Sequence, residues 1–337
     1  MQLNNIFLTI GIPTYNRKDL LLELLGDISK TNPPVLRCEI LIINNGDDLL
    51  IDDELTKLLS DKFVLRVIEN NENCGGQENV LRVYENSCAE YVWVLGDDDR
   101  LAANAVHIII ETLVKENVEV LHFCSDSNSH PLIDTGNKNF NFLELFSGSF
   151  PLRRLMFAPL FVLRRSILVP YFAIARLTFK CFTPQLALMI LSEPKSIYYL
   201  DKTIILSSSL PVTRNQRLSI LPVFLGIFNL PNVSTNCEYR TALKILLKKE
   251  WNFYLKPTKI IGSLAIKKIS GKSIFFKDYI FPGIFSYPIW IVPFFLAALY
   301  IVKILPCNIL NKLLQFYLIS EKGVKADLSD FYSEDRV

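Results

Sequence analysis

Short apolar runs alternate with amphipathic stretches along the first 125 residues of the chain. The apolar runs end at turn-forming or charged residues, which is typical of buried strands. Strands are predicted at 6–11, 39–43, 64–69, 91–95 and 118–124. The intervening stretches carry apolar residues at helical spacing. Helices are predicted at 18–29, 52–59, 76–87 and 102–116.

Strands separated by single helices predict an α/β fold with a doubly wound, mostly parallel sheet. Ligands of such sheets bind beyond the carboxyl ends of the strands. Polar clusters follow three of the predicted strands, at 14–17, 44–48 and 97–99. We therefore expect these clusters to meet at one edge of the sheet.

The charges of the two halves of the chain are opposite, although the net charge is only +2. Residues 1–150 hold 11 basic and 24 acidic residues, a net charge of −13, whereas residues 151–337 hold 25 and 10, a net charge of +15. Half of all residues are hydrophobic, which excludes a disordered chain. The mean hydropathy of +0.27 and the basic second half favour an anionic membrane surface as partner. No nucleic-acid motif is present, so no nucleic-acid partner is expected.

The cysteines and histidines do not predict a metal or disulfide framework. Seven cysteines include no Cys-x-x-Cys pair, and there are only three histidines. This pattern argues against zinc and favours reduced thiols. The start of the chain has no basic segment followed by a cleavable apolar one, so no signal peptide is expected and the bulk of the chain is expected in the cytoplasm.

Three consecutive carboxylates, Asp97, Asp98 and Asp99, follow the fourth predicted strand. Adjacent carboxylates repel one another and are stabilised by a cation. Mg²⁺ binds one or two carboxylates while phosphates of a substrate complete its shell. The cluster therefore predicts a diphosphate–metal site. The alternative is a solvated loop that caps the following helix.

Four segments together resemble family 2 glycosyltransferases, which have the GT-A fold. They are LTIGIPTYNR at 8–17, ILIINNG at 40–46, NCGGQEN at 73–79 and YVWVLGDDDRL at 91–101. The resemblance covers roughly residues 5–125, with the motifs in order. The chain is most similar to bacterial members that build surface polysaccharides such as O-antigen, lipopolysaccharide or capsule.

The resemblance implies a role for each matching residue. Those expected to bind the nucleotide sugar are Pro13, Thr14, Tyr15, Asn16, Arg17, Asn44, Asn79, Asp97 and Asp98. Asn44 stands where the family often has Asp, which leaves the nucleotide open. Asp97 and Asp99 match the outer positions of the metal-binding motif, with Mg²⁺ or Mn²⁺ as cofactor. The family's catalytic base has no counterpart motif here, and the candidates are Glu193, Asp201 and Asp126; ordinary surface acids are the alternative.

The second half of the chain carries two basic regions. Residues 150–182 mix aromatic residues with six cations and no acid, which predicts either a solvated helical face or a surface for a phosphate-bearing acceptor. Residues 240–277 hold ten Lys or Arg and one acid, and the uncharged stretch 279–302 follows. That stretch is long enough to span a bilayer but contains three prolines. A kinked span, a re-entrant hairpin, an in-plane element and a buried core helix pair all remain open.

The sequence thus predicts two regions: a GT-A domain at 1–215, and a helical, membrane-associated region at 216–337 with contact around 279–302. The expected activity is metal-assisted transfer of a sugar from a nucleotide-sugar donor to a lipid-linked glycan acceptor. The resemblance implies inversion at the anomeric carbon. The expected place is the cytoplasmic face of the inner membrane. The alternatives are an inactive membrane-associated scaffold that binds nucleotide, and a nucleotidyltransferase.

Overall fold

A computed structural model describes residues 6–31, 33, 37–46, 53–126, 136–146, 152–177, 183–206, 230–254, 264, 268, 291–306, 308–310 and 312. The chain divides into two compact units. The first takes residues 1–179, 183–210 and 233–242, and the second takes 180–182, 211–232 and 243–337. The sheet and all the candidate site residues belong to the first unit.

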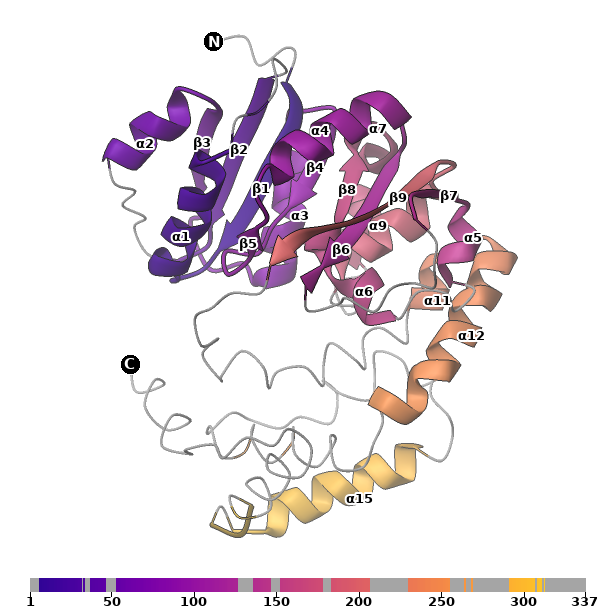
Figure 1. The fold of residues 1–337 in the computed structure, drawn as a ribbon. Helices are drawn as coiled ribbons and strands as arrows, with labels where there is room; N and C mark the ends of the chain where they lie inside the picture. Colours follow the sequence, from indigo (N-terminus) through magenta and orange to yellow (C-terminus); the bar gives the residue numbers. More distant parts are fainter. Residues whose placement is uncertain are drawn as a thin grey trace. The chain divides into compact units, whose positions relative to one another are not determined.

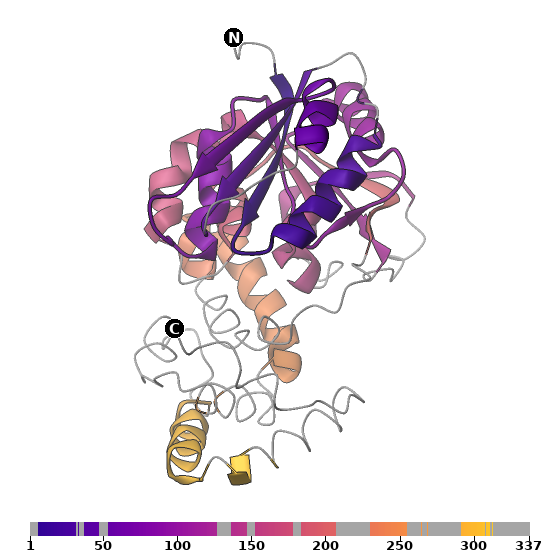
Figure 2. The same cartoon turned by 90° about the vertical axis from the view of Figure 1, so that its left-hand side faces the viewer.

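Four parallel strands form one side of the sheet, in the order β3-β2-β1-β4. They are β1 (Ile6–Thr14), β2 (Arg37–Asn44), β3 (Val64–Glu69) and β4 (Tyr91–Val94). The apolar residues of β1, β2 and β4 are almost entirely buried, because helices cover both faces of the sheet (Figures 1 and 2). These strands confirm the expected α/β fold. β1 continues through Pro13 to Thr14, beyond its predicted end.

The other side of the sheet is mixed, and its strands come from distant parts of the chain. The order continues β4-β8-β6-β9-β5, with β7 also paired to β9. The bounds are β5 (Arg100–Leu101), β6 (Val120–Ser125), β7 (Lys138–Phe140), β8 (Phe161–Arg164) and β9 (Ile197–Leu206). β8 is antiparallel to both β4 and β6, so β6 runs in the same direction as β4. The sequence pattern predicts β6 but none of the other four.

Helices α1, α2, α3 and α4 lie where the apolar spacing predicts them. Their bounds are Lys18–Ser29, Asp53–Ser60, Gly76–Asn86 and Ala105–Glu116. α3 packs very closely on β1 at Gly11, where an added Cβ would stand 1.9 Å from Val83 Cγ1. Only glycine permits this approach of helix and strand.

Shorter helices follow in the remainder of the first unit. They are α5 (Phe142–Glu144), α6 (Leu152–Met156), α7 (Arg165–Leu168), α8 (Phe172–Leu177) and α9 (Pro184–Ser192), with 3₁₀ turns at Ala158–Leu160 and Val169–Tyr171. The apolar residues of α9 are buried from Leu186 to Ile190.

The described helices beyond residue 229 are α11 (Leu230–Val233), α12 (Cys237–Tyr254) and α15 (Ile291–Ile304). Over the residues that the structure covers, no helix has both the length and the apolar character needed to cross a bilayer. Of the predicted membrane contact at 279–302, residues 279–290 lie outside the described residues. The part from 291 onward falls in α15.

Candidate functional site

The polar clusters predicted at the strand ends meet at one edge of the sheet. β1 and β2 end side by side, with Thr14 opposite Asn44 in the register. β4 flanks β1 on its other side and runs directly into the loop that carries Asp97. The carboxyl ends of three parallel strands thus place residues from distant parts of the sequence together.

Asp97 lies at the centre of this edge and is held from both sides. Thr14 Oγ1 donates a hydrogen bond to Asp97 Oδ2 at 2.8 Å, and Arg17 Nη1 pairs with Asp97 Oδ1 at 2.8 Å. The same guanidinium nitrogen lies 3.6 Å from Asp98 Oδ2. Burial raises the pKa of Asp97, and the neighbouring Arg17 and Thr14 oppose that rise. Arg17 therefore joins the loop after β1 to the loop after β4 through ion pairs with Asp97 and Asp98.

Asp99 is buried at the turn after β4. Its Oδ2 accepts a 2.6 Å hydrogen bond from the Gly96 N–H. A Cβ on Gly96 would lie 2.9 Å from Asp98 Oδ1 and 3.1 Å from Asp99 Oδ2, so the absent side chain makes room for both carboxylates. Burial raises the pKa of Asp99 to about 8, and the neighbouring Asp98 and Asp97 charges add to the rise.

The ends of β2 and β3 place a carboxylate and an amide together. Asn44 Nδ2 donates to Glu69 Oε2 at 2.5 Å, and Asn44 Oδ1 accepts from the Gly46 N–H at 3.2 Å. A Cβ on Gly46 would stand 1.8 Å from Asn16 Oδ1, so the loops after β1 and β2 are in close contact here. Where the family often has an acid, this chain thus has an amide paired with an acid from the next strand.

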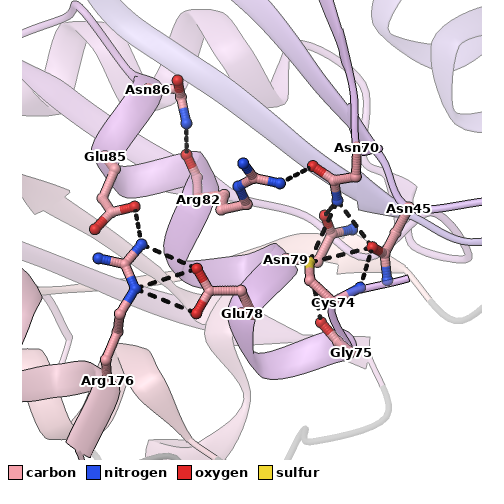
Figure 3. Close-up of polar contacts among 10 residues, drawn as sticks. All are labelled: Asn45, Asn70, Cys74, Gly75, Glu78, Asn79, Arg82, Glu85, Asn86 and Arg176. Carbon is pink, nitrogen blue, oxygen red and sulfur yellow. Dashed lines mark hydrogen bonds and ion pairs between the residues drawn. The ribbon is translucent and has the colours of Figure 1, made fainter. Parts of the chain in front are cut away.

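A cluster of side-chain amides lies beside that pair (Figure 3). Asn70 Nδ2 donates to Asn45 Oδ1 at 2.8 Å and to Asn79 Oδ1 at 2.9 Å. Asn70 Oδ1 accepts in turn from the guanidinium of Arg82 on α3. Asn70 therefore links the end of β3, the loop after β2 and the first half of α3.

The amide cluster also binds the main chain. Asn79 Nδ2 donates to the carbonyl oxygens of Thr14 and Ile43, at 3.3 and 3.1 Å. Asn45 Oδ1 accepts from the Cys74 N–H at 2.9 Å. These bonds satisfy main-chain groups at the ends of β1 and β2 and fix where α3 begins.

Pro13 and Tyr15 flank Thr14 at the end of β1. Pro13 pairs with Ile43 in the register and is partly buried. The Tyr15 side chain is 50% exposed, which is high for an aromatic residue next to a buried strand end.

The three base candidates lie in different places. Asp126 directly follows β6 and is exposed, at the same edge of the sheet as Asp97 because β6 and β4 run in the same direction. Glu193 adopts φ 46° at the end of α9 and precedes β9, which runs parallel to β6, so Glu193 lies toward the opposite edge. Asp201 is exposed within β9, and its N–H donates to Asn137 Oδ1 at 3.0 Å.

Three arginines of the basic stretch 150–182 hold structural elements together. Arg164 donates to Tyr91 and Asn117, and Arg165 donates to the carbonyl oxygens of residues 84 and 85. Arg176 on α8 pairs with Glu78 and Glu85 of α3, at 2.9 and 2.6 Å (Figure 3). These three guanidinium groups therefore make contacts within the fold, and the Arg176 side chain remains 41% exposed.

Sequence reasoning includes Asn45 in the predicted cluster at 44–48 but names no role for Glu69, Asn70 or Arg82. Glu69 and Asn70 occupy the end of the third predicted strand, so the same strand-end rule identifies them. Arg82 gives no signal in the sequence, because its partner is twelve residues away on a different element.

The donor atoms at Asp97 and Asp99 suit a hard divalent cation. Both side chains offer oxygen only, and both are buried close to a third carboxylate, Asp98. Among the described residues, no group of three or more His, Cys, Asp or Glu is arranged to hold a metal ion. The residues fit a cation that phosphate oxygens of a ligand help to coordinate, as Mg²⁺ and Mn²⁺ sites commonly are.

The chain is similar to known proteins in sequence. Residues 9–168 match the profile of "Glycosyl transferase family 2". Abequosyltransferase RfbV of Salmonella typhimurium is 32% identical over 108 residues, which cover 31% of this chain and 32% of the relative. The chain thus matches about a third of the length of that curated relative.

Solved structures share the fold. S. aureus TarS superposes with a TM-score of 0.56 at 12% identity, over 88% of this chain and 55% of TarS. The fragment TarS 1–349 in complex with UDP-GlcNAc gives a TM-score of 0.56 at 14% identity, over 88% of this chain and 90% of the fragment. The sheet that the sequence predicts is therefore of the GT-A type, and residues 9–168 are similar to glycosyl transferase family 2.

Proposed function

We propose that the protein is a glycosyltransferase that moves a sugar from a nucleotide-sugar donor to a glycan acceptor in the synthesis of a cell-surface polysaccharide. The observation that carries the proposal is the cluster of Thr14, Arg17, Asp97 and Asp99 at the carboxyl edge of a domain that is similar to glycosyl transferase family 2. A likeness to an abequosyltransferase supports the sugar-transfer class.

In this proposal the donor lies across the carboxyl ends of the strands. Its diphosphate lies near the carboxylates after β4, and its nucleoside extends over the ends of β1 and β2. Thr14, Tyr15, Asn16 and Asn44 would line the nucleoside. The amide cluster around Asn79 keeps those strand ends in place, so the site is preorganised before the donor arrives.

The chemistry needs stabilisation of the leaving nucleoside diphosphate and removal of a proton from the acceptor hydroxyl. A divalent cation held at Asp97 and Asp99 would supply positive charge at the leaving phosphate. Asp126 is our candidate for the base, because it lies at the same edge of the sheet as Asp97 and is exposed.

The acceptor in this proposal is a lipid-linked glycan, met at the cytoplasmic face of the inner membrane. Support comes from the ten Lys or Arg between residues 240 and 277, which favour an anionic surface. We place the catalytic domain at residues 1–215 and the membrane-contacting region at 216–337. Sedimentation of the full chain with vesicles of anionic or neutral lipid tests this part of the proposal.

The decisive experiment is a panel of nucleotide sugars, scored by thermal stabilisation with and without Mn²⁺. A ligand present at 100 times its Kd stabilises the fold by about 2.7 kcal/mol, so a true donor gives a clear rise in Tm. Asp97→Asn and Asp99→Asn should remove the rise, whereas Asp61→Asn, an exposed acid after α2, should keep it.

A donor that stabilises the protein is then tested for release of its nucleoside diphosphate in the presence of bacterial membranes. Binding without turnover would favour the inactive scaffold over the enzyme. No stabilisation by any donor, with or without metal, would overturn the proposed function.

A further inference from the structure

Arg17 is the counter-ion of two carboxylates, and one of them, Asp97, is a proposed ligand of the divalent cation. Its Nη1 lies 2.8 Å from Asp97 Oδ1 and 3.6 Å from Asp98 Oδ2. Both side chains are more than two-thirds buried, so their negative charge needs a compensating charge nearby. In the structure, the positive partner of both carboxylates is the Arg17 guanidinium.

The main chain around Arg17 is fixed, but the side chain is not enclosed. The Arg17 carbonyl accepts from the Leu21 N–H at 3.1 Å, which ties the residue to the start of α1. On its other side Asn16 has φ 50° and is wedged against Gly46. The Arg17 side chain is 27% exposed, and its described contacts use a single nitrogen, Nη1. It can therefore change partner by rotation about its side-chain bonds alone.

A guanidinium and a divalent cation cannot share the same carboxylate oxygen, because two positive charges at that separation repel each other. If the cation held at Asp97 and Asp99 takes the Asp97 oxygen that Arg17 now holds, Arg17 loses its 2.8 Å partner. A diphosphate bound beside the carboxylates offers replacement partners, since the planar fork of a guanidinium matches phosphate oxygens bidentately.

We propose that Arg17 is the resident counter-ion of Asp97 and Asp98, and that it transfers to the donor diphosphate when a divalent cation displaces it. This inference rests on the proposed function. It makes Arg17 a donor-positioning residue that couples the binding of the cation and the donor. The cation alone binds weakly, because its binding leaves Arg17 without its Asp97 partner. With the donor present the cation binds tightly, because the diphosphate then pairs with Arg17. By linkage the donor binds more tightly with the cation, by the same factor.

The test measures the binding of Mn²⁺ alone to the full chain. The electron paramagnetic resonance signal of free Mn²⁺ reports how much of the ion remains unbound. We expect Arg17→Gln to bind Mn²⁺ about tenfold more tightly than the unchanged protein, within the usual range of coupling. The matched control is Arg100→Gln, which removes the same charge from the residue next to Asp99. Arg100 pairs with Glu23 and Asp27 instead, so its loss should leave Mn²⁺ binding unchanged.

The second arm measures binding of UDP, GDP, CDP and dTDP at saturating Mn²⁺. Arg17→Gln should weaken binding of the preferred nucleotide about tenfold or more, the size of a lost charge-assisted pair, and Arg17→Lys should restore part of it. Circular dichroism confirms that each variant is folded.

Equal Mn²⁺ affinity in Arg17→Gln and the unchanged protein would overturn the inference, and so would unchanged nucleotide affinity. An equal gain in Mn²⁺ affinity in Arg100→Gln would also overturn the inference, because the loss of any nearby positive charge would then explain the gain. The proposed function fails separately. It fails if no nucleotide sugar binds the unchanged protein, whereas donor binding with no effect at Arg17 contradicts only the exchange.

Discussion

Gly11 and Val83 fit together so closely that β1 and α3 would separate if Gly11 carried a side chain. A Cβ at residue 11 would lie 1.9 Å from Val83 Cγ1, and both residues are fully buried. We predict that Gly11→Ala destabilises the fold by about 1–3 kcal/mol, the usual cost of overpacking a core. Adding Val83→Ala should recover part of that loss. Urea unfolding of both single variants and the double variant measures the coupling, and purely additive losses would contradict the prediction.

Glu39 is a fully buried acid, and Arg66 supplies the positive charge that compensates its carboxylate. Arg66 Nη1 lies 2.8 Å from Glu39 Oε1, and Thr9 Oγ1 donates to Oε2 at 2.6 Å. Arg66→Met should cost about 3 kcal/mol, because it leaves a buried charge uncompensated. Glu39→Gln in the same background removes that charge and should restore much of the stability. Chemical denaturation of the four proteins in the cycle tests this, and a double variant as unstable as Arg66→Met would refute it.

The buried imidazole of His122 predicts a loss of stability in acid. It stacks on Phe161 at 4.4 Å between ring centroids, and Nδ1 lies 3.0 Å from the Leu160 carbonyl oxygen. Burial lowers the pKa of His122 to about 3, and the nearby Arg154 charge adds to the lowering. The unfolded chain, with a histidine pKa near 6.5, binds the proton first. Stability should therefore fall between pH 6.5 and 3, by at most about 1.4 kcal/mol per pH unit from this group.

His122→Phe should remove that contribution. The free energy of unfolding of the unchanged protein, relative to that of His122→Phe, should therefore decrease as the pH falls. The matched control is His107→Gln on α4, which changes a histidine whose side chain is 42% exposed and lies outside the core. Parallel curves for His122→Phe and the unchanged protein would contradict the assignment.

Arg154 is predicted to destabilise the fold. Its side chain is buried, Nη2 lies 3.2 Å from Cys124 Sγ, and neither Nε nor Nη1 has a hydrogen-bond partner among the described residues. Arg154→Met should leave stability unchanged or raise it by about 1–3 kcal/mol, since it removes a buried charge that the described residues satisfy only in part. Arg165→Met, which loses two hydrogen bonds to carbonyl oxygens, should lower it. A clear loss in Arg154→Met would show a favourable interaction of that charge in solution.

Asn70 is predicted to matter for donor binding more than for stability. Its amide joins Asn45, Asn79 and Arg82, which position the ends of the strands. Asn70→Ala should weaken donor binding about tenfold while Tm falls by only a few degrees, because a small displacement of positioning residues is costly for a site. Asn86→Ala, which removes a single bond to the Arg82 carbonyl at the other end of α3, is the control and should keep donor affinity.

The sequence predicts the parallel side of the sheet well and the mixed side poorly, for a physical reason. β1, β2 and β4 are buried on both faces and therefore read as continuous apolar runs. β9 is interrupted by the exposed Asp201 and Lys202, where its register with β6 shifts, so its pattern breaks in the middle. β5 has only two residues and carries no period at all.

The same division holds for the site. Thr14 and Asp97 follow apolar strands, so the strand-end rule predicts that they lie together. The interactions of Arg17 with Asp97, and of Asn44 with Glu69, depend on which neighbouring side chain lies within reach. That information exists only once the strand order is known.

The strand order has a consequence for how the protein is made. β1 to β4 are complete once residue 94 has been synthesised, yet the outer edge of β4 pairs with Phe161–Arg164, and β6 pairs with Ile197–Leu206. A nascent chain that has emerged only as far as α4 presents β4 as an apolar edge with no partner. Such edges recruit other chains. Slow translation between residues 95 and 160 should therefore favour aggregation, whereas a pause after residue 206 should be harmless.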